Sequence, residues 1–184
     1  MKRLFDFTVA AIALALLWPV MLATAILVRR SSPGGALFVQ PRVGRYEMPF
    51  ECYKFRTMAV GAPVAGSHAV SSSWVTPLGR RLRSAKLDEL PPLFNVLRGD
   101  MSLVGPRPCL LNQPAVIEAR RKRNVFGVRP GITGPAQLAA IDMSTPEALA
   151  EADRGYVDSQ SFVGDLRIIL STTLGGGAGD AARY

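Results

Sequence analysis

The sequence predicts a mostly α-helical protein with a short β-hairpin, an α+β fold in which an N-terminal membrane segment precedes a single further domain. Three observations support this fold class. Residues 7–28 contain no charged side chain. A short apolar run at 36–40 and a segment that alternates apolar and polar residues at 50–58 follow. Runs with helical spacing and helix-start residues fill most of the remaining chain. We expect a membrane helix at 1–30, a domain at 31–174 and a flexible tail at 175–184.

The composition is that of a basic protein with enough residues for one domain. The chain has 184 residues, a hydrophobic fraction of 48% and a formal net charge of +8. A basic surface favours anionic lipids, phosphorylated substrates or nucleic acid. Beside an apolar anchor the lipid and phosphate interpretations gain weight, and we expect no nucleic acid. Two cysteines and one histidine form no metal-ligand cluster, which argues against a zinc site and a disulfide framework.

The apolar segment at 7–28 exceeds the roughly 20 residues that a membrane-spanning helix needs. A cleaved signal peptide has a shorter apolar region and a small-residue cleavage site, whereas this run ends at Arg29 and Arg30. A straight spanning helix and a re-entrant hairpin are the two remaining alternatives.

Pro19, near the middle of the apolar segment, predicts a kink, because proline removes one backbone hydrogen bond and clashes with the preceding turn. Basic residues flank both ends, as Lys2-Arg3 and Arg29-Arg30. Such flanks favour the cytosolic side of a membrane. A helix that enters, turns at Pro19 and leaves by the same face places both basic flanks on the cytosolic side. A straight span places only one of them there. The residues alone leave both topologies open.

The segments after the anchor give the expected elements in order. Strands are expected at 36–40 and 50–58, with a turn at 41–44 and a mobile loop at 61–73. Helices are expected at 77–84, 89–97, 113–123, from Thr145 onward and at 161–174. The last of these is amphipathic, so it suits either the core or a membrane surface. A face of this kind also suits a homodimer contact.

Two adjacent carboxylates, Asp88 and Glu89, stand at the start of the helix expected at 89–97. Asp88 is the expected N-cap, Pro91 and Pro92 fall in the first turn, and Gly99 is the expected stop. A helix N-terminus favours the ionised form of a carboxyl group. An ionised carboxylate can attack phosphorus or coordinate Mg²⁺, and two neighbouring carboxylates repel each other without a cation.

Arginines near this pair are candidates to offset phosphate charge, namely Arg83, Arg98, Arg107 and Arg129. The alternative is structural: Asp88 is only a cap and the arginines are a solvated face. A membrane-anchored basic adaptor that binds anionic lipid or nucleic acid without chemistry fits that alternative. An isolated Asp-Glu pair does not decide between them.

Longer motifs carry a family resemblance that covers nearly the whole chain. They are residues 5–7 (FDF), 53–58 (YKFRTM), 75–80 (VTPLGR), 86–108 (KLDELPPLFNVLRGDMSLVGPRP) and 128–134 (VRPGITG). In this order they resemble the bacterial polyprenyl-phosphate sugar-phosphate transferases, the monotopic phosphoglycosyl transferases. The short chain resembles the minimal catalytic form of that family.

The resemblance implies transfer of a sugar-1-phosphate from a UDP-sugar to a polyprenyl phosphate such as undecaprenyl phosphate, with release of UMP, as the first membrane step of glycoconjugate assembly. It implies that Asp88 is the nucleophile of a covalent phosphosugar intermediate and that Mg²⁺ assists. Glu89 is the second member of the catalytic pair, as a metal ligand or as an acid/base. Arg83, Arg107 and Arg129 match the phosphate-handling arginines.

The resemblance also implies a re-entrant membrane helix that is hinged at Pro19, with the catalytic domain on the cytosolic face of the inner membrane. Two residues depart from the family pattern. Trp18 stands before Pro19, where a small polar residue is expected, and Pro135 follows Gly134, where a bulky apolar residue is common. These departures bear on the hinge angle and on the nucleotide pocket.

Overall fold

A computed structural model describes residues 1–63 and 71–175 of the chain. The mobile loop expected at 61–73 and the flexible tail expected at 175–184 fall mostly outside these ranges. The described residues form helices with two small sheets, which confirms a mostly α-helical fold with a β-hairpin. The elements are α1 (Lys2–Ser31), β1 (Leu37–Val43), β2 (Pro49–Phe55), α2 (Pro77–Ser84), α3 (Pro92–Arg98), β3 (Ser102–Val104), α4 (Pro114–Lys122), β4 (Gly131–Thr133), α5 (Pro135–Leu138), α6 (Pro146–Ser159) and α7 (Phe162–Thr173).

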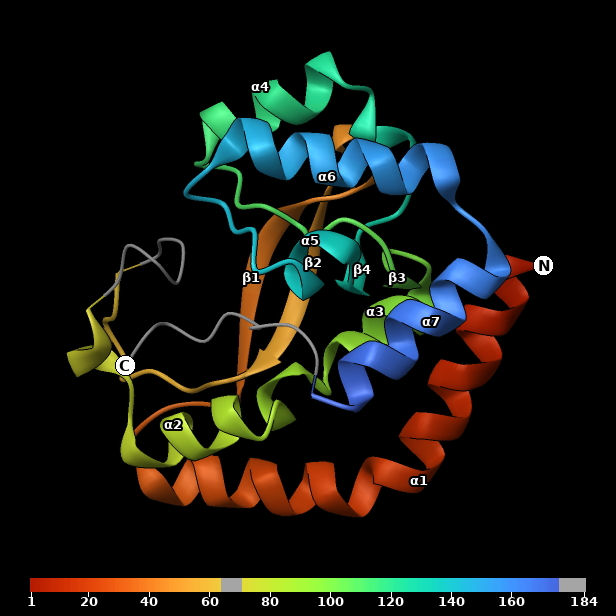
Figure 1. The fold of residues 1–184 in the computed structure, drawn as a ribbon. Helices are drawn as coiled ribbons and strands as arrows, with labels where there is room; N and C mark the ends of the chain where they lie inside the picture. The colour runs from red at the N-terminus through yellow and green to blue at the C-terminus, as the bar shows by residue number, and fades with distance from the viewer. Residues whose placement is uncertain (64–70, 176–184) are drawn as a thin grey trace.

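Helix α1 runs along the outside of the molecule and changes direction part-way along its length (Figure 1). It is long and apolar enough to cross a membrane. Pro19 lies inside it, and the residues on both sides remain helical. The expected helix-break-helix is therefore wrong in one respect, because the helix bends without an interruption. Proline removes only its own donor, so the surrounding hydrogen bonds can continue through a kink.

The N-terminal end of α1 is fastened to the following domain by two cations. Lys2 Nζ lies 2.6 Å from Asp165 Oδ2 in α7 and donates to the Val104 carbonyl at 3.1 Å. Arg3 donates to the carbonyls of Val96 and Leu97, at 2.5 and 2.9 Å, in the last turn of α3. The start of the apolar helix is thus part of the domain's hydrogen-bond network.

The C-terminal end of α1 is fastened to the same domain by Arg56, just after β2. Its buried guanidinium donates to the carbonyls of Ser32, Pro33 and Gly35, at 2.9, 2.6 and 2.7 Å. These carbonyls belong to the turn that follows the helix. Both ends of α1 are therefore held by one domain.

The hairpin of β1 and β2 is antiparallel, with Leu37 opposite Phe55 and Val43 opposite Pro49. The turn expected at 41–44 is wrong, because Pro41 lies inside β1 and the chain reverses at Arg45–Glu47. A two-stranded sheet has only edge strands, so the missing N–H of a proline can face away from the partner.

A second, parallel pair joins β3 to β4, with Ser102 opposite Gly131 and Val104 opposite Thr133. The sequence analysis did not predict it. Gly131 lies so close to the preceding chain that an added Cβ would stand 2.1 Å from the backbone nitrogen of Gly105. This sheet lies against α1, α3 and α7, and it brings the chain on either side of Arg129 to the segment that carries Arg107.

Helices α4 and α6 pack together around a fully buried ion pair. Arg120 in α4 contacts Asp153 Oδ2 in α6 through Nη2 at 2.7 Å and Nε at 2.9 Å. The remaining arm of the guanidinium, Nη1, donates to the Arg107 carbonyl at 2.8 Å. The pair thus connects the helical layer to the segment that carries Arg107.

The other expected helices are confirmed with small differences at their ends. Helix α2 has the expected bounds, and Thr76 caps it by accepting from the Gly79 N–H at 2.9 Å. Helix α6 starts after Thr145 as expected, although the Thr145 side chain makes no capping bond. Both cysteines, Cys52 and Cys109, are buried and unpaired.

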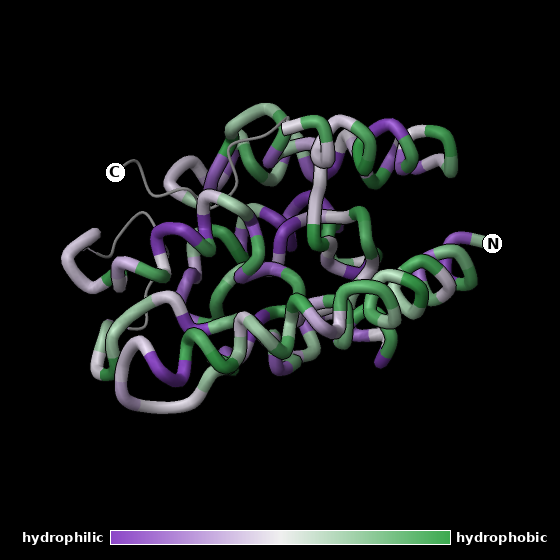
Figure 2. The backbone as a smooth tube through the Cα atoms, turned by 90° about the horizontal axis from the view of Figure 1, so that it is seen from below, coloured by the Kyte–Doolittle hydropathy of each residue, from purple (hydrophilic) through white to green (hydrophobic). Residues whose placement is uncertain are grey.

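The underside of the molecule, seen in Figure 2, carries long hydrophobic stretches of α1. Helix α7 lies beside the N-terminal half of α1, where the rings of Phe5 and Phe162 meet edge to face with centroids 5.0 Å apart. On α7 the large apolar side chains of Phe162, Leu166 and Leu170 are exposed. The amphipathic helix therefore leaves much of its apolar face uncovered by the described part of the chain.

Candidate active site

Asp88 and Glu89 lie in a short 3₁₀ turn, Leu87–Glu89, between α2 and α3. The expectation that Asp88 caps a helix at 89–97 is wrong, because α3 begins at Pro92 with Pro91 as its N-cap. A proline fits the first helical position, where its missing N–H costs nothing, so the Pro-Pro pair sets the start of the helix. Gly99 ends the helix as expected, with a left-handed φ of 95°.

The Asp88 carboxyl group is buried, with 8% of the residue exposed. Burial raises its pKa above the ordinary value, and the positive charge of Lys54 opposes this shift. Glu89 raises the pKa further, while Arg83 and Arg107 lower it. The expectation that a helix N-terminus favours the ionised form is therefore wrong in direction, because desolvation outweighs the neighbouring charges.

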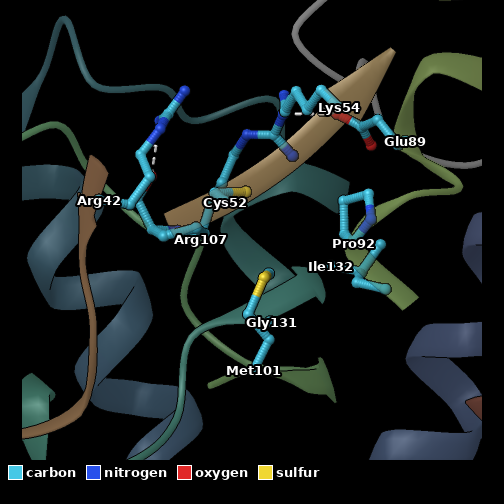
Figure 3. A pocket seen from close by; sticks show the side chains of 10 residues that line it. Arg42, Cys52, Lys54, Glu89, Pro92, Met101, Arg107, Gly131 and Ile132 are labelled. Carbon is cyan, nitrogen blue, oxygen red and sulfur yellow. Dashed lines mark hydrogen bonds and ion pairs between the residues drawn. The ribbon is translucent and has the colours of Figure 1, made fainter. Parts of the chain in front are cut away.

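Glu89 accepts a hydrogen bond from Arg107 Nη2 at 2.5 Å and lies 3.5 Å from Lys54 Nζ. Figure 3 shows these three side chains around a small pocket, with Arg42 and Cys52 on its wall. Lys54 and Cys52 come from β2, Arg42 from β1, and Arg107 from the segment after β3. Elements far apart in the sequence thus place three cations on one carboxylate-bearing pocket.

The structure brings two of the three expected phosphate-handling arginines to the carboxylate pair. Arg107 contacts Glu89, and Arg83 in α2 acts on the Asp88 pKa while its Nε donates to Thr57 Oγ1 at 2.9 Å. Arg129 lies elsewhere: its Nε donates to the Gly99 carbonyl at 2.8 Å, at the end of α3 opposite the pair.

Arg98, the other sequence candidate, is the last residue of α3 and is exposed. Its side chain is 57% exposed, and Nη1 donates to the Tyr53 hydroxyl at 2.6 Å. Sequence reasoning missed Lys54 and Arg42 as members of the site. Lys54 falls within the motif at 53–58, but only the pairing of β1 with β2 and their position over α3 show that it faces Glu89.

The donor set suits Mg²⁺ only when a substrate completes it. The described residues contain no group of three or more acidic, histidine or cysteine side chains that could hold a metal ion. Asp88 and Glu89 offer two hard carboxylates. Mg²⁺ is commonly bound by one or two carboxylates together with substrate phosphate oxygens and water. The residues present therefore fit a metal that arrives with a phosphorylated substrate.

A larger, mainly apolar cavity of about 250 Å³ adjoins the pair, and Glu89 lines it as well as the polar pocket. Its walls come from α1, α5 and α7 and from the start of α3. One carboxylate thus stands between a cationic pocket and an apolar cavity. Such an arrangement suits a phosphate that is attached to a hydrophobic group.

Comparison with known proteins agrees with this chemistry. The uncharacterized sugar transferase EpsL of Bacillus subtilis (strain 168) is 40% identical over 173 residues, covering 94% of this chain and 85% of that protein. A UDP-glucose:undecaprenyl-phosphate glucose-1-phosphate transferase of Caulobacter vibrioides is 41% identical, covering 93% of this chain and 67% of that protein. A UDP-N-acetylgalactosamine-undecaprenyl-phosphate N-acetylgalactosaminephosphotransferase of Aeromonas hydrophila is 38% identical, covering 93% of this chain and 42% of that protein.

The family model described as bacterial sugar transferase matches residues 1–176. The match includes the apolar helix, the carboxylate pair and the segment that carries Arg107 and Arg129. From this match and these relatives, we conclude that the chain belongs to the bacterial sugar transferase family.

Proposed function

We propose that this chain, a phosphoglycosyl transferase, moves a sugar-1-phosphate from a UDP-sugar to undecaprenyl phosphate through a covalent intermediate on Asp88. The observation that carries the proposal is the buried Asp88 carboxyl group, close to Lys54, Arg83 and Arg107. The names of the relatives from Caulobacter and Aeromonas supply the two substrates.

In the proposed reaction an oxygen of the ionised Asp88 carboxylate attacks the sugar-bearing phosphorus of the donor. A bond forms between that oxygen and phosphorus, and the bond to the bridging oxygen breaks, so UMP leaves with the bridging oxygen and its electron pair. An oxygen of the polyprenyl phosphate then attacks the same phosphorus and displaces the carboxylate. A polyprenyl-diphosphate sugar forms and Asp88 is regenerated, which gives ping-pong kinetics.

Each side chain around Asp88 has a role in this scheme. Lys54, Arg83 and Arg107 stabilise the negative charge that builds up on the phosphoryl oxygens. Asp88 and Glu89 would hold Mg²⁺ together with the diphosphate of the donor. The metal supplies charge neutralisation on the departing UMP.

We also propose that α1 is re-entrant and that the domain lies on the cytosolic face of the inner membrane, against anionic lipids. Lys2 and Arg3 fasten one end of α1 to the domain, and Arg56 fastens the other. A domain on one side of a bilayer can hold both ends only if the helix enters and leaves by the same face. The exposed apolar face of α7, beside α1, suits the headgroup boundary.

We expect repeated turnover, seen as UMP release beyond one equivalent of protein, to require a UDP-sugar, undecaprenyl phosphate and Mg²⁺ together. The measurement is UMP formation by purified protein with a panel of UDP-hexoses and UDP-N-acetylhexosamines. A chelator should abolish turnover, and added Mg²⁺ should restore it, because two adjacent carboxylates add to the negative charge of the donor diphosphate and a cation would neutralise it. Equal turnover in the presence of the chelator would exclude the metal, and no turnover with any donor would exclude the transferase.

Site-directed labelling tests the topology of α1. Cysteines introduced as Lys2→Cys and Arg30→Cys should both react with a membrane-impermeant maleimide from the cytosolic side only. The native thiols Cys52 and Cys109 are buried, so the wild-type chain is the matched control for background labelling. Labelling of the two introduced positions from opposite sides would show a straight span.

The acid limb of the pH profile should depend on Lys54. The rate rises with pH as Asp88 ionises, and the charge of Lys54 lowers the Asp88 pKa. Lys54→Met should therefore move the acid limb of kcat/KM for the donor to higher pH. Lys122→Met, which removes an exposed lysine paired with Glu118, is the matched control and should leave the limb in place. An unchanged limb in Lys54→Met would contradict the assignment.

A further inference from the structure

The apolar cavity next to the carboxylate pair has no role in donor chemistry, and its lining indicates an occupant. We propose that it holds the first isoprene units of the polyprenyl acceptor, with the acceptor phosphate directed at Asp88. This proposal rests on the proposed function, because it names the site at which one of the two substrates binds. It assigns the donor and the acceptor chain to different cavities that meet at Glu89.

The apolar wall of the cavity is assembled from elements distant in the sequence. Val9 comes from α1, Leu138 from α5 and Ile169 from α7, while Leu93 of α3 and Ile132 of β4 complete the wall. A volume of about 250 Å³ accepts a short hydrocarbon segment rather than a whole lipid. Burial of aliphatic groups against such a wall is favourable in proportion to the apolar area removed from water.

The polar groups in the wall are mostly bonded to one another. The hydroxyls of Thr133 and Thr172 are 2.7 Å apart, and Gln137 Nε2 donates to the Ile132 carbonyl at 3.2 Å. A sugar ring needs several hydrogen-bond partners from its pocket. Among these side chains only Gln137 Oε1 is buried without a hydrogen-bond partner in the described part of the chain, so the wall offers a sugar ring one unpaired acceptor. An isoprene chain needs none. The wall therefore favours the hydrocarbon of the acceptor over the hexose of the donor.

The two charged residues that line the cavity are close together in the sequence. Lys86 and Glu89 flank Asp88 in sequence, and both line the cavity. A prenyl phosphate whose chain occupies the apolar part would have its phosphate beside this segment. The ammonium group of Lys86 is a charge partner for that phosphate. The phosphate oxygen would then lie next to the segment that contains Asp88, whose carboxyl group carries the phosphosugar.

Two of the helices that line the cavity, α1 and α7, also carry exposed apolar side chains. Ile12 and Leu16 on α1 and Leu166 and Leu170 on α7 are exposed. A polyprenyl chain that leaves the cavity alongside these helices stays in apolar surroundings up to the bilayer. A water-soluble nucleotide sugar has no need of this route. The cationic pocket of Figure 3, formed by the hairpin and Arg107, remains for the charged phosphate part of the donor.

The first test fills the cavity. Ile169→Trp places a larger ring in the apolar part, and Leu170→Trp, the next residue on the exposed side of α7, is the matched control. Farnesyl phosphate in detergent is the probe, and its Kd is measured by calorimetry. Exclusion of about two buried methylene groups should weaken binding by Ile169→Trp roughly tenfold. Leu170→Trp should bind as the wild type does. Equal affinities for Ile169→Trp and wild type would overturn the proposal.

A second variant keeps the proposal testable where a bulky residue disturbs folding. Leu138→Cys introduces a thiol into the cavity wall. The two native thiols, Cys52 and Cys109, are buried and lie outside this wall. Farnesyl phosphate should slow its reaction with a small maleimide at least about tenfold, whereas inorganic phosphate should not. Protection by both ligands alike, or by neither, would show that the chain is not in this cavity.

The binding measurements separate this proposal from the proposed function. If the wild type releases no UMP with any donor, the transferase assignment fails, and the farnesyl phosphate comparison still decides what the cavity holds. If UMP is released and Ile169→Trp binds farnesyl phosphate normally, only the cavity assignment fails. In the supporting case, Ile169→Trp forms the stoichiometric UMP burst with donor alone at the wild-type rate and has a raised KM for the acceptor.

Discussion

Asp88→Asn is expected to reduce donor-dependent UMP release by roughly 10⁴-fold or more, the scale seen when a nucleophile is removed. The carboxamide has nearly the shape of the carboxylate but cannot form the bond to phosphorus. The measurement is UMP release with donor alone and with donor plus acceptor, together with the intact mass of the protein after incubation with donor. The wild type should gain the mass of a sugar phosphate, and Asp88→Asn should not.

Glu89→Gln is the matched control for the change of charge. It alters the neighbouring carboxylate, which contacts Arg107 and Lys54, and leaves the proposed nucleophile in place. Its loss of rate should be smaller, and the adduct should still form, though slowly. An Asp88→Asn protein that releases UMP as fast as the wild type would exclude Asp88 as the nucleophile.

Asp88→Asn also has an expected effect on stability. Measuring it tests whether misfolding, rather than loss of the nucleophile, explains a loss of activity. Burial raises the Asp88 pKa in the folded state, so the folded protein binds more protons than the unfolded one between the two pKa values. Stability therefore falls as pH rises through that interval, and at neutral pH the ionised carboxylate destabilises the fold. Asp88→Asn should unfold at or above the wild-type temperature at neutral pH. A clear drop in Tm would mean that the side chain stabilises the fold.

Arg120→Met is expected to lower the free energy of unfolding by about 3–5 kcal/mol, the cost of leaving one charge of a buried pair alone. Arg120 is 2% exposed and Asp153 is fully buried, so water cannot replace the lost partner. The measurement is denaturant unfolding in detergent. The double variant Arg120→Met with Asp153→Leu should recover most of the loss, because an apolar pair of similar size does not leave a buried charge.

Activity of the double variant separates packing from positioning. Arg120 Nη1 donates to the Arg107 carbonyl, and Arg107 in turn contacts Glu89. A double variant with restored stability but a lowered kcat would show that Arg120 positions Arg107. A double variant as unstable as Arg120→Met would contradict the expected cost of an isolated buried charge.

The sequence predicted the elements that depend on local signals. The start of α2 follows from Thr76 and Pro77, which are a side-chain cap and a first-turn proline in adjacent positions. The hairpin follows from a short apolar run at 36–40 and from alternation at 50–58, and the observed strands are Leu37–Val43 and Pro49–Phe55. The β3–β4 pair did not follow, because three-residue strands show no period and their pairing joins Ser102 to Gly131 across the chain.

The candidate site also combines features that the sequence predicted with features that depend on tertiary contacts. The Asp88-Glu89 pair is visible as a motif, but the environment of Asp88 depends on side chains from β2, α2 and the segment after β3. Local reasoning gave the wrong direction for the Asp88 pKa because it considered only the adjacent helix. It also could not separate Arg107, which contacts Glu89, from Arg129, which holds the end of α3.

The attachments of α1 have a consequence for biosynthesis. Lys2 leaves the ribosome well before its partners Val104 and Asp165, which lie 102 and 163 positions later. In the proposed membrane arrangement, the apolar helix would therefore reach the bilayer before most of the groups that fasten its first turn have been translated. Lipid and the helix's own sequence must set its course during that interval. Completion of the chain then adds the contacts that hold the existing topology. Truncation before α7 should therefore leave α1 in the membrane without the contact between Lys2 and Asp165.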